Sequence, residues 1–171
     1  MGPEGDLEKR HRILQDIMRA SHFEWLDTAL SASKGVGRRE LVLRYWTKVG
    51  VDTAKAYLRR IDGSRPVPRQ VADMIAFSSV TMGEDAQVVP GKDDSEAFVE
   101  HQACPWWDWH QKMRMPEEDL PGCDAWFSAL VGEVGRALGI DLRVETREAM
   151  PLEGPRCVRR IWQSTGAKKR K

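Results

Sequence analysis

Apolar and charged residues follow one another at helical spacing through the first half of the chain. From Leu7 to Leu30 the apolar residues recur at close to helical spacing, with charged side chains between them. This periodicity predicts an amphipathic helix that ends at the glycines beginning with Gly35. The same spacing predicts a second helix over 38–61 and, after the proline-containing turn at 62–68, a third helix over about 70–80.

The spacing changes to alternation of apolar and polar residues in the second half. The patterns predict, in order, two strands, a helix and two strands, over 86–89, 96–103, 124–138, 140–145 and 157–162. In the second of these strands, Val99 and His101 share a face. The segment 104–123 follows neither period, contains several prolines and is expected to be irregular.

Two glycines, Gly132 and Gly135, lie three residues apart inside the helix predicted over 124–138. A glycine in a helix interior costs about 0.5–1 kcal/mol relative to alanine. Their presence predicts that another backbone or a ligand approaches this helix closely at both positions.

Helical spacing first and alternation afterwards are typical of an α+β fold with an antiparallel sheet. We expect a single domain over 1–163. In this domain a helical half at about 6–82 packs on a small antiparallel sheet at about 86–163, with one long helix between strand pairs. The basic end of the chain, 164–171, is expected to be a disordered tail.

The composition is that of a soluble globular protein with nearly balanced charge. Its 171 residues include 27 Lys and Arg against 26 Asp and Glu, a net charge of +1. This balance excludes the strongly basic character of a general nucleic-acid binder, so Arg156, Arg159 and Arg160 are interpreted as ordinary solvated charge. No apolar run reaches the roughly 18 residues of a membrane span, and the polar N-terminus shows no secretory signal. We therefore expect a cytoplasmic protein without a membrane partner.

The three cysteines stand at the ends of predicted elements. Cys104 follows one strand, Cys123 precedes the long helix and Cys157 begins the last strand. Element ends can converge at one side of a small sheet, so we expect the three side chains to line one cavity. The alternative is that they are small core residues, since cysteine is among the most buried residue types.

Tryptophans are concentrated in and just after the segment expected to be irregular. Trp106, Trp107, Trp109 and Trp126 lie within 21 positions of the sequence. Aromatic side chains in such a segment can form the wall of a pocket for a small flat ligand. They can equally anchor a loop on the core, and both interpretations stay open.

The second half of the chain resembles a known family. The motifs HQACP, PGCDAW and LGIDLRVETREAMPLEGPRC, which contain the three cysteines, resemble the L-2-amino-thiazoline-4-carboxylic acid hydrolase family. More distantly, they resemble small-molecule-binding domains of the 4-vinyl reductase type. The resemblance implies a ligand pocket near the cysteines. In zinc-binding relatives of the latter type, a Glu and a further Cys precede the last cysteine. Here Glu145 matches that Glu, whereas Glu148 stands where the further Cys is expected.

Two functions from different classes follow. The first is a hydrolase acting on a small cyclic amidine, thiazoline-like or amide compound. Cys104 is the candidate nucleophile, His110 the base and Asp108 the residue that orients it. His101, three residues before Cys104 on an extended strand, is expected to project from the opposite face and is the weaker candidate base.

The alternative is a non-catalytic binding or sensor module. In this interpretation the cavity binds a small molecule, or Cys104, Cys123, Cys157 and Glu145 hold zinc or another divalent metal as soft and carboxylate ligands. The expected partner is a small-molecule ligand and not a nucleic acid. A homodimer is compatible with the sequence, which does not determine the oligomeric state.

Overall fold

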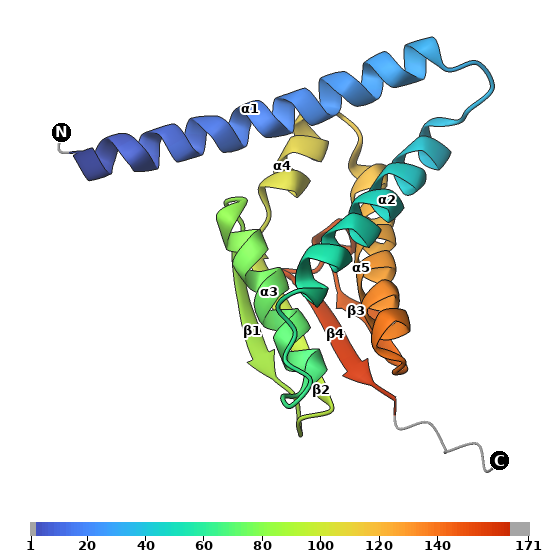
Figure 1. The fold of residues 1–171 in the computed structure, drawn as a ribbon. Helices are drawn as coiled ribbons and strands as arrows, with labels where there is room; N and C mark the ends of the chain where they lie inside the picture. The colour runs from blue at the N-terminus through green and yellow to red at the C-terminus, as the bar shows by residue number, and fades with distance from the viewer. Residues whose placement is uncertain (1–2, 165–171) are drawn as a thin grey trace.

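The computed structural model describes residues 3–164 and has a mixed helical and sheet architecture (Figure 1). Three helices come first: α1 (Pro3–Ala32), α2 (Arg38–Leu58) and α3 (Val67–Thr81). The remaining elements are β1 (Asp85–Pro90), β2 (Glu96–Ala103), α4 (Pro105–Lys112), α5 (Pro116–Leu138), β3 (Leu142–Glu148), the short 3₁₀ helix η1 (Met150–Leu152) and β4 (Cys157–Gln163). The predicted α+β class, with helices first and one long helix between strand pairs, is confirmed.

The four strands form one antiparallel sheet in the order β1-β2-β4-β3. Helix α3 packs on β1 and β2, α5 packs on β3, and α2 packs on α5, so the helices cover one face of the sheet (Figure 1). In the central pair, Val99 is opposite Arg159 and His101 is opposite Cys157. Because side chains alternate along a strand, all four of these face the helices.

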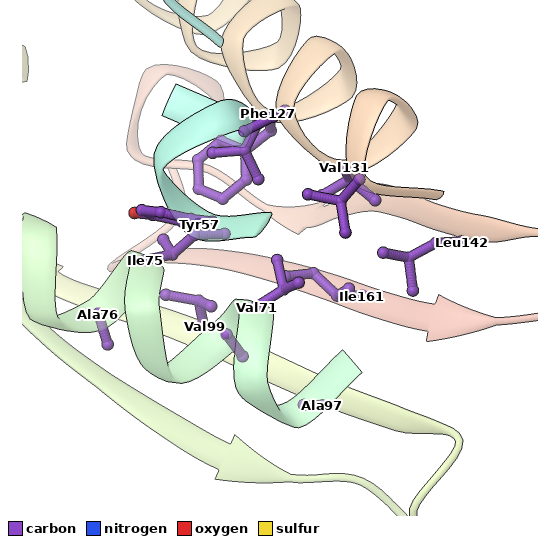
Figure 2. Close-up of a cluster of buried hydrophobic side chains, with 14 residues drawn as sticks. Tyr57, Val71, Ile75, Ala76, Ala97, Val99, Phe127, Val131, Leu142 and Ile161 are labelled. Atoms are coloured by element: carbon purple, nitrogen blue, oxygen red, sulfur yellow. The ribbon is translucent and has the colours of Figure 1, made fainter. Parts of the chain in front are cut away.

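The core lies between this face and the helices. Val99 and Ile161 of the sheet are fully buried, as is Ile75 of α3. Figure 2 shows these side chains beneath Phe127 and Val131 of α5. The apolar stripes of α3 and α5 at 3.6-residue spacing thus meet the apolar face of alternating strands, as the patterns predicted.

The segment 104–123 is helical, which corrects the expectation that it is irregular. It contains α4 and the first residues of α5. Pro105 and Pro116 are the first residues of these helices, where a missing N–H leaves no helical hydrogen bond unmade. Arg114, with φ of 59°, separates the two helices. Only Pro121 lies inside a helix, and there it removes one backbone hydrogen bond without ending α5.

Close approach is found at Gly135 and not at Gly132. A Cβ on Gly135 would lie 3.0 Å from the carbonyl oxygen of Ile140 and 3.0 Å from Leu142 Cβ. A Cβ on Gly132 would have no such neighbour within 4 Å, because Gly132 lies on an exposed side of α5. The prediction is therefore wrong for Gly132.

None of the helices in residues 3–164 combines the length and apolar character that a membrane span requires. The basic tail predicted at 164–171 falls, from residue 165 on, outside the described residues.

Candidate functional site

A cavity of about 340 Å³ lies where four helices meet the central strands. Helix α2 contributes Trp46, and α5 contributes Trp126 and Phe127, which make much of its surface apolar. The sheet contributes His101 of β2 and side chains of β4. The other lining residues are Val49, Thr53, Ser78, Ser79, Met82, Glu84, Cys104, Trp106, His110, Asp119, Cys123, Cys157 and Arg159.

All three cysteines line this cavity. Cys104 is the N-cap residue of α4, Cys123 lies in α5, and Cys157 begins β4 directly opposite His101. The expected cavity lined by the three cysteines is therefore present, but Cys123 lies inside α5, which begins at Pro116, and not before the helix as expected. The chemical roles assigned to the cysteines stay predictions.

Each thiol is in a setting that favours its protonated form. Burial raises the pKa of Cys104 far above that of a free thiol, and the charge of Glu84 adds to the rise. Burial raises the pKa of Cys123 to about 12, although the nearby Arg159 opposes part of the shift. Burial also raises the pKa of Cys157, whose Sγ accepts a hydrogen bond of 3.3 Å from the Met150 N–H. Neutral thiols at neutral pH are weak nucleophiles.

Both histidines of the cavity are held by carboxylates. His101 Nε2 lies 3.0 Å from Ser79 Oγ and 3.1 Å from Glu84 Oε2. His110 Nδ1 lies 2.8 Å from the carbonyl oxygen of Trp106 and 2.9 Å from Asp119 Oδ1. Since both of its oxygen partners accept, the Nδ1 of His110 carries the proton.

These contacts correct two details of the predicted catalytic group. Asp108 is exposed on α4, and the carboxylate that contacts His110 belongs to Asp119. His101 lines the same cavity as Cys104, because the chain leaves the strand after Ala103 and Cys104 no longer follows its alternation.

The tryptophans divide between the two interpretations that the sequence left open. Trp106 and Trp126 line the cavity, whereas Trp107 and Trp109 are not among its lining residues. Trp109 stacks on Phe23 of α1 with ring centroids 5.9 Å apart. The Lys112 ammonium lies over the Trp109 ring, 4.4 Å from the ring centroid. Trp109 is thus an anchor between helices.

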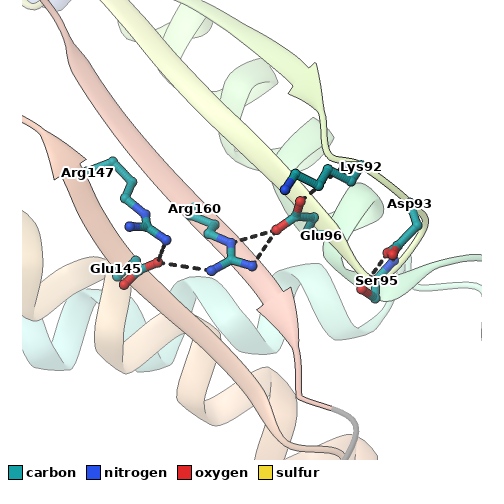
Figure 3. Close-up of polar contacts among 7 residues, drawn as sticks. All are labelled: Lys92, Asp93, Ser95, Glu96, Glu145, Arg147 and Arg160. Atoms are coloured by element: carbon teal, nitrogen blue, oxygen red, sulfur yellow. Dashed lines mark hydrogen bonds and ion pairs between the residues drawn. The ribbon is translucent and has the colours of Figure 1, made fainter.

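The proposed metal ligands do not form a metal site. Glu145 is on the opposite face of the sheet, where its Oε1 lies 2.6 Å from Arg147 Nη2 and 3.3 Å from Arg160 Nη1 (Figure 3). Within residues 3–164, no three side chains of His, Cys, Asp or Glu are arranged to hold a metal ion. The residues present therefore do not fit zinc.

The sequence interpretation missed the cation in the cavity wall. Arg159, expected to be solvated, is 2% exposed. Its Nη2 lies 3.2 Å from Asp124 Oδ1, and its guanidinium carbon lies 5.1 Å from the ring centroid of Phe127. Its position two residues before the core residue Ile161 in an alternating strand is the signal that places it on the inner face.

No family model and no curated protein matches the sequence. Several solved structures resemble the fold, and two of them are bound to small molecules. One is trafficking protein particle complex subunit 3 from Naegleria fowleri, covalently bound to palmitic acid, with a TM-score of 0.57 and 13% identity over 90% of this chain and 96% of that one. The other is the phenol-responsive sensory domain of the transcription activator PoxR with phenol, with a TM-score of 0.51 and 13% identity over 88% and 76%. At this identity the likeness establishes a shared α+β fold.

Proposed function

We propose that the protein is a binding module for a small, largely apolar organic molecule, which it holds in the cavity between α2, α3, α4, α5 and the sheet. The observation that carries this proposal is the cavity of about 340 Å³, with tryptophan and phenylalanine walls and a few inward polar groups. Ligand sites have this character, and their volumes run from about 300 to 1,000 Å³. The volume is at the low end, which favours a compound of one or two rings.

The structural neighbours support the same class of function. One holds palmitic acid covalently and the other holds phenol, both small organic compounds with substantial apolar surface. The ligand of this chain does not follow from theirs, because the identity is 13% in each case. A shared fold makes a binding role reasonable but does not determine the ligand.

Tryptophan fluorescence tests the proposal directly, because Trp46, Trp106 and Trp126 line the cavity. Titration with 2-naphthol, 2-naphthoate and 2-naphthamide is expected to give saturable quenching by at least one compound, with the affinity confirmed by calorimetry. A Val49→Phe variant, which fills the cavity, should lose that binding. Val89→Phe, on the outer face of β1, is the matched control and should keep it. Failure of all three compounds to bind the folded protein would contradict the proposal.

A second candidate is the hydrolase of small amide, amidine or thiazoline-like compounds. It is favoured by one observation, that Cys104 and His110 line the same cavity, with Asp119 in the orienting position. The nucleophile would have to lose its proton before it attacks the substrate carbon. The raised pKa of Cys104 opposes this step, which is why the binding module is preferred.

Alkylation of the thiols distinguishes the two candidates. At neutral pH, iodoacetamide should modify Cys104 of the folded protein at least about tenfold more slowly than Cys104 of the urea-unfolded chain, because each unit of pKa rise lowers the thiolate fraction about tenfold. Peptide mass spectrometry measures each cysteine separately. A Cys104 that reacts faster in the folded protein than in the unfolded chain would favour the hydrolase.

A further inference from the structure

Arg159 brings a buried positive charge to the wall of a cavity that tryptophan and phenylalanine side chains also line. Its side chain is 2% exposed, and its Nε and Nη1 groups donate no hydrogen bond to any atom of residues 3–164. Buried N–H groups of a charged side chain are almost always paired, since leaving them unpaired is costly. A group with this character in a cavity wall indicates that a ligand atom completes its hydrogen bonding.

The neighbouring acids do not neutralise this cation within the cavity. Glu84 lies beside His101 and Asp119 lies beside His110. The acid paired with Arg159 is Asp124, whose side chain is 45% exposed and whose Oδ1 also accepts a 2.6 Å hydrogen bond from Thr146. Solvent therefore screens the pair between Arg159 and Asp124, and the guanidinium remains available to an anion.

We propose that the ligand is an apolar monocarboxylate, whose acid group is bound by Arg159 and whose apolar part lies against Trp126 and Trp106. This inference rests on the proposed binding function and names the chemical class of its ligand. An unpaired N–H of Arg159 donates a hydrogen bond to one carboxylate oxygen. This charge-assisted bond is stronger than a hydrogen bond to a neutral acceptor. A single arginine matches a single negative charge, whereas a dianionic phosphate would call for further cations, and no lysine or second arginine of residues 3–164 lines the cavity.

A matched pair of probes and a matched pair of variants test whether Arg159 binds the acid group of the ligand. The probes are 2-naphthoate and 2-naphthamide, which have the same rings and nearly the same shape but differ in charge. The variants are Arg159→Met and Arg160→Met, adjacent residues of β4 on opposite faces of the sheet; Arg160 pairs with Glu96 on the outer face. Calorimetry on the full chain at about pH 8, where the acid is ionised, measures all combinations.

We expect 2-naphthoate to bind the unmodified protein at least about tenfold more tightly than 2-naphthamide. Arg159→Met should abolish this preference, because it lowers the affinity for 2-naphthoate and leaves the affinity for 2-naphthamide unchanged. Arg160→Met should retain the preference. If Arg159→Met does not fold, the unmodified protein alone tests the inference: tighter binding of the acid than of the amide supports it, and equal binding contradicts it.

Two results would overturn the inference in distinguishable ways. If the amide binds as tightly as the acid, the cavity binds small molecules but Arg159 does not select an anion, so the proposed function stands and this inference fails. If neither probe binds and 2-naphthol also fails to bind, the proposed function fails and the inference with it. An unchanged preference in a folded Arg159→Met protein also contradicts the role assigned to Arg159.

Discussion

His22 lies among the aromatic rings that join α1 to the rest of the molecule. Its ring centroid is 5.0 Å from that of Tyr45, 5.2 Å from that of Trp46 and 5.5 Å from that of Trp106. Burial, and secondly the charge of His110, lowers the pKa of His22 to about 4. The folded protein therefore favours the neutral ring, and a proton on His22 works against folding.

This depressed pKa predicts a specific loss of stability in mild acid. Below the ordinary histidine pKa of about 6.5 the unfolded chain binds a proton that the folded protein does not, so the contribution of His22 is present above that pH and declines towards about pH 4. A His22→Phe variant should lose this decline, on the order of 2 kcal/mol. Urea unfolding at several pH values measures it. The exposed His11→Phe variant is the control, and parallel pH profiles for His22→Phe and the unmodified protein would contradict the prediction.

The two glycines of α5 provide a paired test at single-residue scale. Gly132→Ala places a methyl group in open space and should stabilise the protein by about 0.5–1 kcal/mol through helix propensity. Gly135→Ala gains the same propensity but presses its Cβ against Ile140 and Leu142, so we expect a net loss of stability. Thermal unfolding of the two variants compares them. Equal shifts in Tm would show that the turn between α5 and β3 yields to the added methyl group.

At the scale of elements, the crossing of α2 over α5 determines where the cavity walls stand. A Cβ on Gly50 of α2 would lie 2.6 Å from the carbonyl oxygen of Trp126 and 2.9 Å from Ala129 Cβ. A Cβ on Gly122 of α5 would lie 2.7 Å from Cδ1 of Trp46. The absent side chains let the helices approach and bring both tryptophans to the cavity.

Gly50→Ala should therefore force the helices apart and destabilise the protein by about 1–3 kcal/mol, because a backbone carbonyl cannot move aside as a flexible side chain can. Chemical denaturation with calorimetry measures the effect. Gly63→Ala, in a loop position where an added Cβ meets nothing within 4 Å, should change stability much less. A Gly50→Ala protein as stable as the unmodified chain would mean that α2 and α5 have room to shift.

Periodicity was sufficient to predict most elements because each helix and strand has one apolar face. The strand at 96–103 and its inward residues agree with β2, and the helix from residue 38 agrees with the start of α2. Helix α4 could not be predicted this way, since its eight residues make only about two turns, too few to establish a helical period. Prolines at the first turn of a helix resemble loop prolines until the structure shows where each helix begins.

The site was predictable only as far as it depended on element ends. Cys104 and Cys157 lie at such ends, and all three cysteines line the cavity although Cys123 lies inside α5. Asp119 could not be chosen over Asp108, because the choice depends on how α5 packs beside α4 and no local pattern encodes that packing. The charge of Arg159 suggested an exposed side chain. Its position in the strand indicates the opposite, because residues two apart in a strand share a face and Ile161 faces inward.

Across the whole sheet, the outer face is held by a chain of ion pairs. Arg160 of β4 lies 2.5 Å from Glu96 of β2 and 3.3 Å from Glu145 of β3, so one guanidinium links three strands (Figure 3). The backbone N–H of Lys92, and secondly Arg160, lowers the pKa of Glu96. The ionised form of Glu96 thus contributes to the folded state.

A lowered carboxyl pKa contributes stability above the unfolded value of about 4.5, and this stability is lost as the pH falls through the folded pKa. Glu96→Gln should therefore be less stable than the unmodified protein at neutral pH, and the difference should shrink as the pH falls below about 4.5. Denaturation at neutral and acidic pH tests this. Asp94→Asn, exposed in the same turn, should show no such convergence, and a constant deficit for Glu96→Gln would argue for a packing effect instead.

The strand order β1-β2-β4-β3 has a consequence for how the chain is made. A ribosome delivers β4 after the other three strands, yet β4 occupies the centre of the sheet between β2 and β3. Until β4 has emerged, the strand β2 has an unpaired edge and β3 has no partner in the sheet, so nascent chains expose surfaces that invite association. The cavity also cannot form before this step, because two of its lining residues, Cys157 and Arg159, belong to β4. The sheet and the cavity are therefore completed together, once β4 has emerged.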